Sequence, residues 1–583
     1  MKQFFKIVFG TVIGIFLFLI ICFGLILLAS GKKEELKENS VLKLELNKRI
    51  VERETDNFFS QLNLPFGDAE GSIGLLELKK AIKNAKSDSN IKGIVIKTSS
   101  VEAGYASLEE IRKALLDFKS TGKFVIAYGD SYSEGAYFLA SVADKIYLPE
   151  EGGLELNGLD VEIMFFKKLL DKLEIQPELF KVGEYKSASE PFIRENMSDE
   201  NRKQLTELLD SFYKVYISNV AKSRKIEEAK LKEISDSMKV RKAQDALQYK
   251  LITDIGYFSD AEDFIRKKLL IQSKEKINYV GYNHYLSVFS EEEGENTSAN
   301  KIAVIYANGS IEDGQGTDNT IGGESLAKEI RKAREDDDVK AIVLRVNSPG
   351  GSALASDIIW NEVQLCKKPI IASMGDMAAS GGYYISMACD TILAEPSTIT
   401  GSIGVFGLFF QGQKFLNEKI GITSDRVKTG EYSDIGSFTR PVSSSERQII
   451  QSEVDRIYES FTQKAAKGRN ISVDKLKEVA KGRVWSGTQA KEIKLVDMFG
   501  GLDDAVNIAS EKAKLGKDYK VVYLPEIKTA LLKEVLLQMG GDEDESALLK
   551  SEFGSLYPYL KKLKEVKSYE GIQARLPYEI QIK

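Results

Sequence analysis

The chain has 583 residues and a mass of 64.9 kDa, which is too long for one hydrophobic core, so several domains are expected. Its 43% hydrophobic and 29% charged residues are ordinary for a folded globular protein. A net charge of −6 without a basic run argues against a nucleic-acid partner. One histidine and three scattered cysteines cannot form a zinc site, so no metal and no cofactor are expected.

An uncharged, apolar run occupies residues 7–30 near the N-terminus. As a helix it would be roughly 36 Å long, enough to cross the hydrocarbon core of a membrane. A cleaved signal peptide is the alternative, but its apolar region is usually only about 7–15 residues long. We therefore expect a retained single-pass transmembrane anchor over residues 1–31. Lysines on both sides of the run leave its orientation open.

The rest of the chain contains an internal repeat whose matched positions lie a nearly constant distance apart, for example 248 residues from Lys92 to Lys340 and 246 from Asp144 to Asp390. The matched stretches are SNIKGIVIKTSS (89–100) with DDVKAIVLRVNS (337–348), GAYFLASVADKIYLPE (135–150) with GGYYISMACDTILAEP (381–396), FKVGEYKSASEPF (180–192) with DRVKTGEYSDIGSF (425–438), and VRKAQDALQYKLITDIGYFSDA (240–261) with VWSGTQAKEIKLVDMFGGLDDA (484–505). This constant register indicates two tandem domains.

Both halves show the same order of predicted elements: a helix, a strand, a second strand, a turn of small residues and another helix. The first helix and the two strands are expected at 75–84, 94–97 and 124–127 in the first half and at 326–334, 342–346 and 370–373 in the second. This alternation predicts an α/β fold of βαβ units on a largely parallel sheet. We assign the first repeat domain to 38–268, an acidic linker to 269–299, the second repeat domain to 300–515, and a tail without assignable chemistry to 516–583.

The two halves differ at a serine and at a glycine turn. Ser380 in the second half matches Glu134 in the first, and the turn NSPGG (347–351) matches SSVEA (99–103). Ser380 is the candidate nucleophile, and the backbone amides of Gly351 and Gly381 are candidate oxyanion donors. A serine at a helix N-cap and an ordinary glycine turn are the alternatives for each feature taken alone.

A serine nucleophile needs a base, and the halves differ reciprocally at a lysine. Lys186 in GEYKS matches Ser433 in GEYSD, so the half with the serine lacks the lysine. Lysine can act as a base only when burial lowers its pKa enough to leave the amine neutral. The competing base, His284, lies outside every matched stretch. We therefore predict a Ser380–Lys186 dyad assembled from both halves, and the sequence leaves open whether one chain or two supply it.

Five motifs carry a family resemblance: NSPGGSALAS, MAASGGYYIS, TGSIGVFG, GEYKSASEPF and GRVWSGTQAKEIKLVD. Together they resemble the long, tandem-domain form of the signal peptide peptidase A family, which are membrane-anchored serine proteases of bacteria. The resemblance covers about 38–515 and includes the anchor. It implies tandem Clp/crotonase-like domains, Ser380 as nucleophile, Lys186 as general base, and Ser402 as the residue that orients the lysine. The position matched to Ser402 in the first half is Leu156.

The resemblance also implies an activity and a location. The expected enzyme is a serine endopeptidase that degrades remnant signal peptides and other hydrophobic peptides. Its body is expected on the extracytoplasmic (periplasmic) side of the bacterial inner membrane. It is expected to form a dome-like homotetramer, and no nucleic-acid partner is expected. Two rivals remain: a crotonase-type acyl-CoA enzyme, which would use the same paired amides without Ser380 or Lys186, and a catalytically inactive membrane scaffold.

Overall fold

A computed structural model describes residues 36–54, 71–292, 296–317, 319–526 and 571–575, together with three isolated positions near the N-terminus. Among the residues that it describes, no helix has both the length and the apolar character needed to cross a membrane. Apart from those three positions, the apolar run 7–30 lies outside the described residues, so the anchor remains an expectation.

The first half folds around a six-stranded parallel sheet in the order β8-β6-β5-β4-β1-β9. The strand sequences in the middle of this sheet, IKGIVIK, FVIAY and KIYL, are largely apolar, as expected for parallel strands covered on both faces. The strands are β1 Ser40–Glu45, β4 Ile91–Lys97, β5 Phe124–Tyr128, β6 Lys145–Leu148, β8 Asp254–Ile255 and β9 Asn278–Gly281. The helices of this half are α3 Leu75–Ser87, α4 Tyr105–Lys119, α5 Glu134–Ala140, α6 Lys167–Lys172, α7 Glu190–Ile193, α8 Asp199–Arg224, α9 Glu228–Asp236, α10 Ala243–Gln248, α11 Phe258–Leu269 and α12 Tyr282–Glu292.

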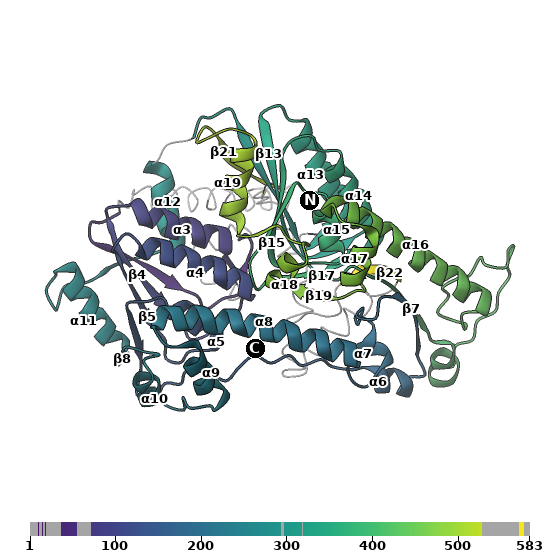
Figure 1. Cartoon of the computed structure of the whole chain (residues 1–583), viewed down its shortest axis with the longest axis horizontal. Coiled ribbons are helices and arrows are strands. Elements are labelled where there is room, and N and C mark those ends of the chain that lie inside the picture. Colours follow the sequence, from purple (N-terminus) through teal and green to yellow (C-terminus); the bar gives the residue numbers. More distant parts are fainter. Residues whose placement is uncertain are drawn as a thin grey trace.

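The second half repeats this plan in an eight-stranded sheet with the order β19-β17-β15-β13-β10-β21, and β16 and β20 join it beside β15. Its strands are β10 Lys301–Asn308, β13 Val339–Ser348, β15 Ile370–Ala379, β16 Thr391–Ala394, β17 Ile399–Gly401, β19 Val484–Ser486, β20 Met498–Phe499 and β21 Lys520–Leu524. Its helices are α13 Gly323–Glu335, α14 Ala353–Gln364, α15 Gly381–Ser386, α16 Ser444–Arg469, α17 Val473–Val479, α18 Gly487–Glu492 and α19 Leu502–Lys512, with a π-helical turn at Phe415–Ile420. Figure 1 shows the two halves side by side. The helices and strands predicted from the repeat are all present.

Each repeat extends one strand beyond the boundaries expected from the sequence. The expected linker 269–299 contains β9, which pairs in parallel with β1, and α12, whose Tyr285 is buried in the core of the first half. The expected tail contributes β21, which pairs with β10 in the same way. Neither strand lies in a matched stretch, so the repeat signal missed them.

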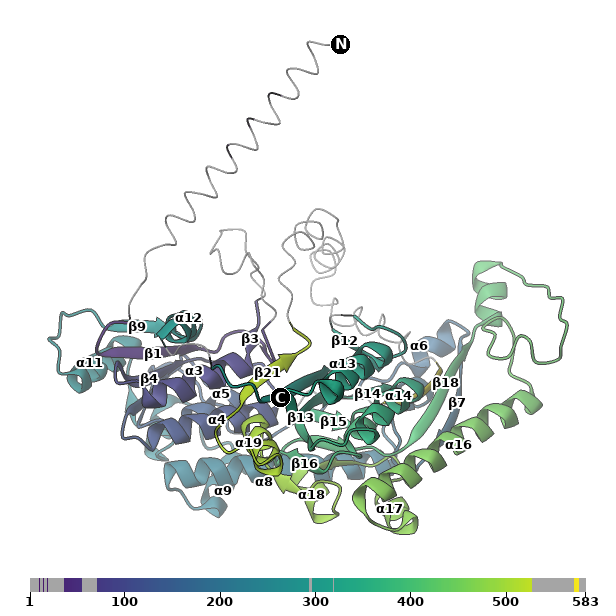
Figure 2. The same cartoon turned by 90° about the horizontal axis from the view of Figure 1, so that it is seen from above.

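A third sheet joins the halves in the order β12-β11-β14-β22-β18-β7. Its strands are β7 Gln176–Val182, β11 Ser310–Glu312, β12 Thr320–Gly322, β14 Gly350–Ser352, β18 Val405–Gln411 and β22 Gly571–Arg575, and a separate two-stranded sheet pairs β2 Ile50–Val51 with β3 Ile73–Gly74. β7 belongs to the first half but pairs antiparallel with β18 of the second half. Figure 1 shows β7, together with α6 and α7, lying on the side of the second half, and Figure 2 shows β7 beside β18 and α16. The first half therefore reaches across the second with one strand and the turn that follows it.

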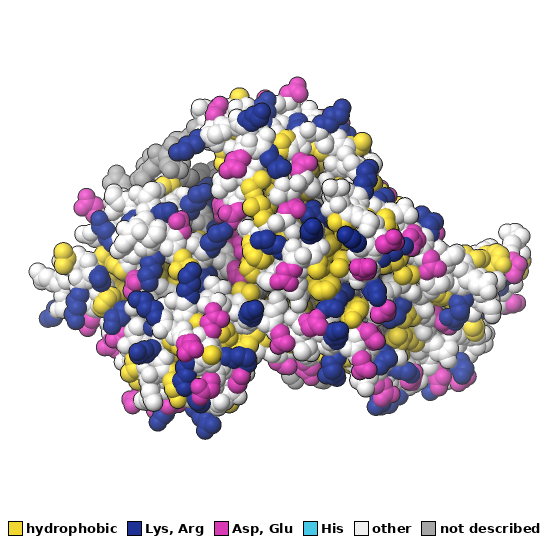
Figure 3. Space-filling view, in the orientation of Figure 1, with side chains coloured by type: hydrophobic (Ala, Val, Ile, Leu, Met, Phe, Trp, Pro, Cys, Tyr) yellow, Lys and Arg dark blue, Asp and Glu magenta, His cyan; other side chains and the backbone are white. Residues whose placement is uncertain are grey.

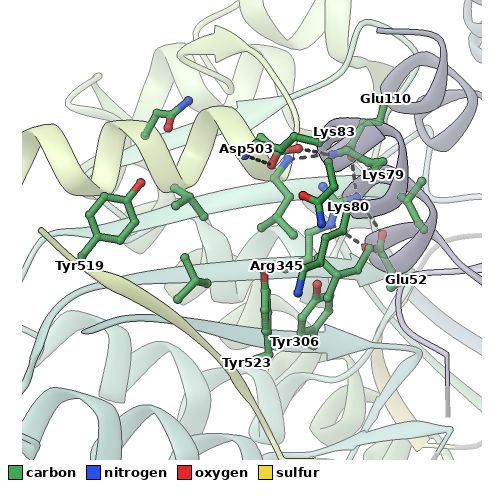
Figure 4. Close-up of a pocket in the computed structure, with 17 residues that line it drawn as sticks. Glu52, Lys79, Lys80, Lys83, Glu110, Tyr306, Arg345, Asp503, Tyr519 and Tyr523 are labelled. Atoms are coloured by element: carbon green, nitrogen blue, oxygen red, sulfur yellow. Dashed lines mark hydrogen bonds and ion pairs between the residues drawn. The ribbon is translucent and has the colours of Figure 1, made fainter. Parts of the chain in front are cut away.

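A buried ion cluster also joins the halves (Figure 4). Arg345 of β13 is fully buried, and its guanidinium lies 2.8 Å from Glu52 and 2.6 Å from Glu110 of the first half. Lys79 pairs with Glu110 and, at 2.8 Å, with Asp503 of the second half. Burial opposes the ionisation of Glu110, but Arg345 and Lys79 outweigh it and lower its pKa to about 2. These residues line a pocket of about 220 Å³ between the halves.

Candidate active site

Ser380 lies at the tight turn between β15 and α15. Its backbone has φ 55° and ψ −111°, a conformation that a non-glycine residue adopts only when its surroundings impose it. The Ser380 amide donates to the carbonyl of Gly401 at 2.8 Å, which ties the turn to the end of β17. Alanine and glycine neighbours let the chain reverse sharply here, and Ser380 is fully buried.

Lys186 reaches this turn from the other half of the chain. It follows β7 and is fully buried. The amide of Tyr185 donates to the carbonyl of Lys481 at 3.0 Å, so the turn after β7 is held by the backbone of the second half. Gly482 makes this approach possible, because a Cβ there would lie 2.6 Å from the Cβ of Lys186.

The two candidate catalytic side chains are in hydrogen-bonding contact. The Nζ of Lys186 lies 2.8 Å from the Oγ of Ser380, and 3.1 Å and 3.2 Å from the Oγ and carbonyl oxygen of Ser402. The Ser402 hydroxyl in turn donates to the carbonyl of Gly482 at 3.3 Å. Ser402 therefore fixes the amine between two oxygen acceptors and the candidate nucleophile.

Burial controls the protonation of Lys186. Removing the ammonium from water lowers the pKa of Lys186 well below its ordinary value. A neutral amine has a free lone pair, so it can accept the serine proton, whereas an ammonium cannot. The site therefore provides a serine hydroxyl and a base within reach of each other.

The glycine turn lies directly beside the residue that follows Ser380. Gly350 has φ +94°, and a Cβ on it would lie 2.6 Å from the amide nitrogen of Gly381. The amide of Gly350 donates to the Oγ of Ser348 at 3.1 Å, which shapes the turn before Gly351. The structure thus places Gly350, the residue before Gly351, directly against the amide of Gly381, and the oxyanion roles of Gly351 and Gly381 stay predictions.

His284 is not part of this arrangement. It lies in α12, whose carbonyl at His284 accepts a hydrogen bond from Ser287, and α12 packs on α3 beside the first sheet. The sequence reasoning missed Gly350 and Gly482, the two glycines that allow close backbone approach. Gly350 stood within the quoted NSPGG turn, but no sequence signal connected Gly482 with Lys186, because that contact depends on how the halves dock.

Comparisons with known proteins agree with this picture. The pattern of peptidase family S49 matches residues 117–271 and 363–516, and that of Clp protease matches 293–396. Protease 4 of Haemophilus influenzae is 38% identical, covering 77% of this chain and 74% of its own, and Protease 4 of Salmonella typhi is 38% identical, covering 86% and 83%. The chloroplastic serine protease SPPA of Arabidopsis thaliana is 33% identical over 93% of this chain and 78% of its own. Two S49 regions and a Clp-like region on a mixed α/β structure fit a tandem Clp-like fold, and the chain belongs to peptidase family S49, a family of serine-type peptidases.

Proposed function

We propose that this serine peptidase works through a Ser–Lys dyad formed by Ser380 and Lys186. The observation that carries the proposal is the 2.8 Å contact between the Lys186 amine and the Ser380 hydroxyl in a fully buried site. Burial of the lysine supports its role, because the base must be neutral when the reaction starts.

The reaction then follows from the positions of these groups. Neutral Lys186 takes the proton of Ser380 as its Oγ attacks the peptide carbonyl carbon. The amides of Gly351 and Gly381 stabilise the oxyanion of the tetrahedral intermediate. Protonated Lys186 then gives its proton to the leaving amine, and water hydrolyses the acyl-enzyme by the same route. Ser402 keeps the amine aimed at Ser380 throughout.

The test is the hydrolysis of a fluorogenic hydrophobic peptide by the full chain in detergent. Ser380→Ala and Lys186→Ala should both abolish turnover, while His284→Ala should retain it. An inactive His284→Ala variant with an active Lys186→Ala variant would assign the base to the histidine instead.

We further propose that the enzyme is anchored in a bacterial inner membrane and degrades remnant signal peptides from the extracytoplasmic side. The apolar run 7–30 supports the anchor, since roughly 36 Å of helix spans a hydrocarbon core. Alkaline extraction of membranes should leave the full chain in the pellet and release a variant that lacks residues 1–31. A synthetic signal peptide should be cleaved faster than a hydrophilic peptide of equal length.

Finally, we propose a head-to-tail homotetramer, and the repeat itself supports this. β7 pairs with β18 inside the chain, but the segments matched to them, 159–165 in the first half and 423–429 in the second, form no strands. A second copy could pair these two segments as β7 and β18 pair here, and repeated heterologous contacts of this kind close into a ring.

Exposed apolar side chains support this interface. Val427 is fully exposed and Ile420 and Ile422 are more than half exposed. In Figure 3, a few hydrophobic side chains are visible at the right-hand end of the molecule, where Figure 1 places the loop between β18 and α16. Val427→Asp should lower the mass measured by light scattering from that of a tetramer toward that of a monomer, and an unchanged mass would contradict this interface.

A further inference from the structure

A buried side-chain amide joins the turn that carries Lys186 to β19 of the second half. The amide belongs to Gln204, near the start of α8, the long helix that runs from beside α7 across to the first half in Figure 1. Its side-chain nitrogen donates to the carbonyl of Tyr185 at 3.1 Å and to the Oγ of Ser187 at 2.9 Å. These two residues flank Lys186, so one amide holds the lysine turn on both sides.

The oxygen of the same amide reaches the second half. It accepts the backbone amide of Val484 in β19 at 3.2 Å. Val484 lies opposite Gly401 in the antiparallel ladder of β19 and β17, and the Gly401 carbonyl accepts the amide of Ser380. The carbonyl of Arg483, the residue before Val484, accepts the amide of Ser402 at 2.7 Å. β19 therefore borders the backbone that holds both serines of the site, and this amide links it to the lysine turn.

The chemistry of these contacts fixes which way the amide faces. A backbone N–H can only donate and a backbone carbonyl can only accept, so the oxygen faces Val484 and the nitrogen faces Tyr185. Asn201 lies beside them with its Oδ1 3.0 Å from the Gln204 nitrogen, and its own amide donates to the Glu190 carboxylate at 2.9 Å. All of these side chains are buried. A hydrocarbon at this position would make neither bond, and a carboxylate ion would only accept.

The second half lacks this amide, just as it lacks the lysine. α8 and α16 are both 26 residues long and begin at matched N-caps, Ser198 and Ser443, whose hydroxyls cap the helices in the same way. In that register Gln204 matches Ile449, which is 44% exposed. The helix therefore forms without the amide, which points to a role for the amide at the turn of Lys186.

We propose that Gln204 is a positioning residue, whose amide holds the Lys186 turn against β19 and so sets the distance between the lysine amine and the Ser380 hydroxyl. This inference rests on the proposed Ser380–Lys186 mechanism. A displacement of about 1 Å between reacting groups can cost about a hundredfold in rate, so a looser turn should lower kcat rather than raise KM. The turn also keeps the amine out of water, so loosening it should return the pKa of Lys186 toward its ordinary value.

The test compares Gln204→Met and Gln204→Glu with wild type in the fluorogenic peptide assay, using the full chain in detergent. Gln204→Met keeps the length of the side chain but makes neither bond, so kcat should fall at least about tenfold while KM stays within about threefold. The acid limb of the pH profile of kcat/KM should move to higher pH, because the lysine becomes easier to protonate. Gln204→Glu should move it further, since an ionised carboxylate beside the turn favours the ammonium.

Leu208→Ala, one turn further along α8, is the matched control. Leu208 is buried in the core of the first half, so this change lowers the free energy of unfolding without removing a bond to the lysine turn. Its kcat and its acid limb should stay as in wild type. Urea unfolding of each variant shows that it is folded before its rates are measured.

The outcomes separate this inference from the mechanism on which it rests. Wild-type kcat and an unmoved acid limb in both Gln204 variants, with Lys186→Ala inactive, overturn the positioning role and leave the dyad standing. An active Lys186→Ala would instead contradict the dyad itself. An equal fall in kcat in Leu208→Ala would assign the loss to weaker folding and would also overturn the positioning role.

Discussion

The two halves of the molecule share a sheet, a strand order and a strand-to-helix turn, yet only one turn holds a candidate nucleophile. In the second half the turn carries Ser380 in a strained backbone conformation. In the first half Glu134 begins α5, capped in the ordinary way by Ser133, whose hydroxyl accepts the amide hydrogen of Ala136. The same local scaffold therefore exists in a strained and in a relaxed form.

The two turns also fill the adjacent space differently. In the first half the Glu134 carboxylate accepts the amides of Asn157 and Gly158, each at 2.8 Å. The matched backbone of the second half, at 403–404, faces Lys186 instead, and a Cβ on Gly404 would lie 3.3 Å from the lysine Cδ. In the first half, the carboxylate of Glu134 thus fills the space beside the turn. In the second half, the side chain of Lys186, which comes from the first half, fills the matched space. The space beside the first-half turn is therefore filled by a side chain of the same half, whereas the space beside the second-half turn is filled by a side chain of the other half.

The largest expected difference between the halves is in activity. Ser380→Ala and Lys186→Ala should each lower kcat/KM by at least about 10³-fold, because removing one member of a catalytic unit disables the whole unit. Glu134→Gln, at the position matched to Ser380, should leave kcat/KM within about threefold of wild type. Initial rates with the fluorogenic peptide provide the measurement. Comparable losses at 134 and 380 would show that both turns take part in the chemistry.

A second difference concerns stability at positions matched across the repeat. Arg345 lies in the buried ion cluster, whereas its counterpart Lys97 ends β4 with its amine 4.9 Å from the ring centre of Phe258. Arg345→Ala should lower the free energy of unfolding by about 3–5 kcal/mol, since it leaves Glu52 and Glu110 without their guanidinium. Lys97→Ala should cost no more than about 1 kcal/mol. Urea unfolding of both variants measures this, and equal costs would mean that the cluster adds nothing.

A smaller effect is expected at Ser402, which matches the core residue Leu156. Ser402→Ala removes a hydroxyl that holds the Lys186 amine in place, so kcat/KM should fall about tenfold. The same hydroxyl oxygen favours the protonated amine, so without it the acid limb of the pH profile of kcat/KM should move to lower pH. Ser402→Thr keeps a hydroxyl and should recover part of the rate. Leu156→Ala should instead lower the free energy of unfolding and leave the pH profile unchanged. An unmoved acid limb in Ser402→Ala would remove Ser402 from the positioning of the lysine.

The smallest effect is a gain in stability. Burial lowers the pKa of Lys186 in the folded state, so between the folded and unfolded pKa values the unfolded chain carries a proton on this lysine that the folded chain lacks. The free energy of unfolding of wild type is therefore lowest at pH values below the folded pKa of Lys186. Stability should rise with pH until the unfolded lysine also loses its proton near about pH 10. Lys186→Met should therefore be inactive yet more stable than wild type at pH 7, and this advantage should shrink as the pH rises. Thermal unfolding at several pH values measures it, and a variant that melts below wild type at pH 7 would contradict the cost of burying the lysine.

Much of this organisation can be predicted from the sequence because duplication leaves an internal alignment. The alternating elements, the glycine turn, Ser380 and Lys186 all stand out against a matched position in the same chain. The proximity of Lys186 to Ser380 was inferred from their reciprocal loss, and the structure supplies its physical basis, which is the pairing of β7 with β18.

Features without a sequence match between the two halves could not be predicted. β9 and β21 lie outside the matched stretches, and the contact between Gly482 and Lys186 exists only after the halves dock. β22 is the clearest case. Its sequence, GIQAR, has little to distinguish it, and its place beside the glycine turn follows from strand pairing across more than 200 residues of chain.

Under the proposed Ser–Lys mechanism, the crossing of β7 into the second half also makes activity depend on folding of both halves. The ribosome releases Lys186 long before Ser380, and N-terminal regions generally fold first. Until β18 forms and accepts β7, the amine has no apolar site to neutralise it and the serine has no base. On this mechanism each newly made chain would acquire peptidase activity only after β18 has formed and paired with β7.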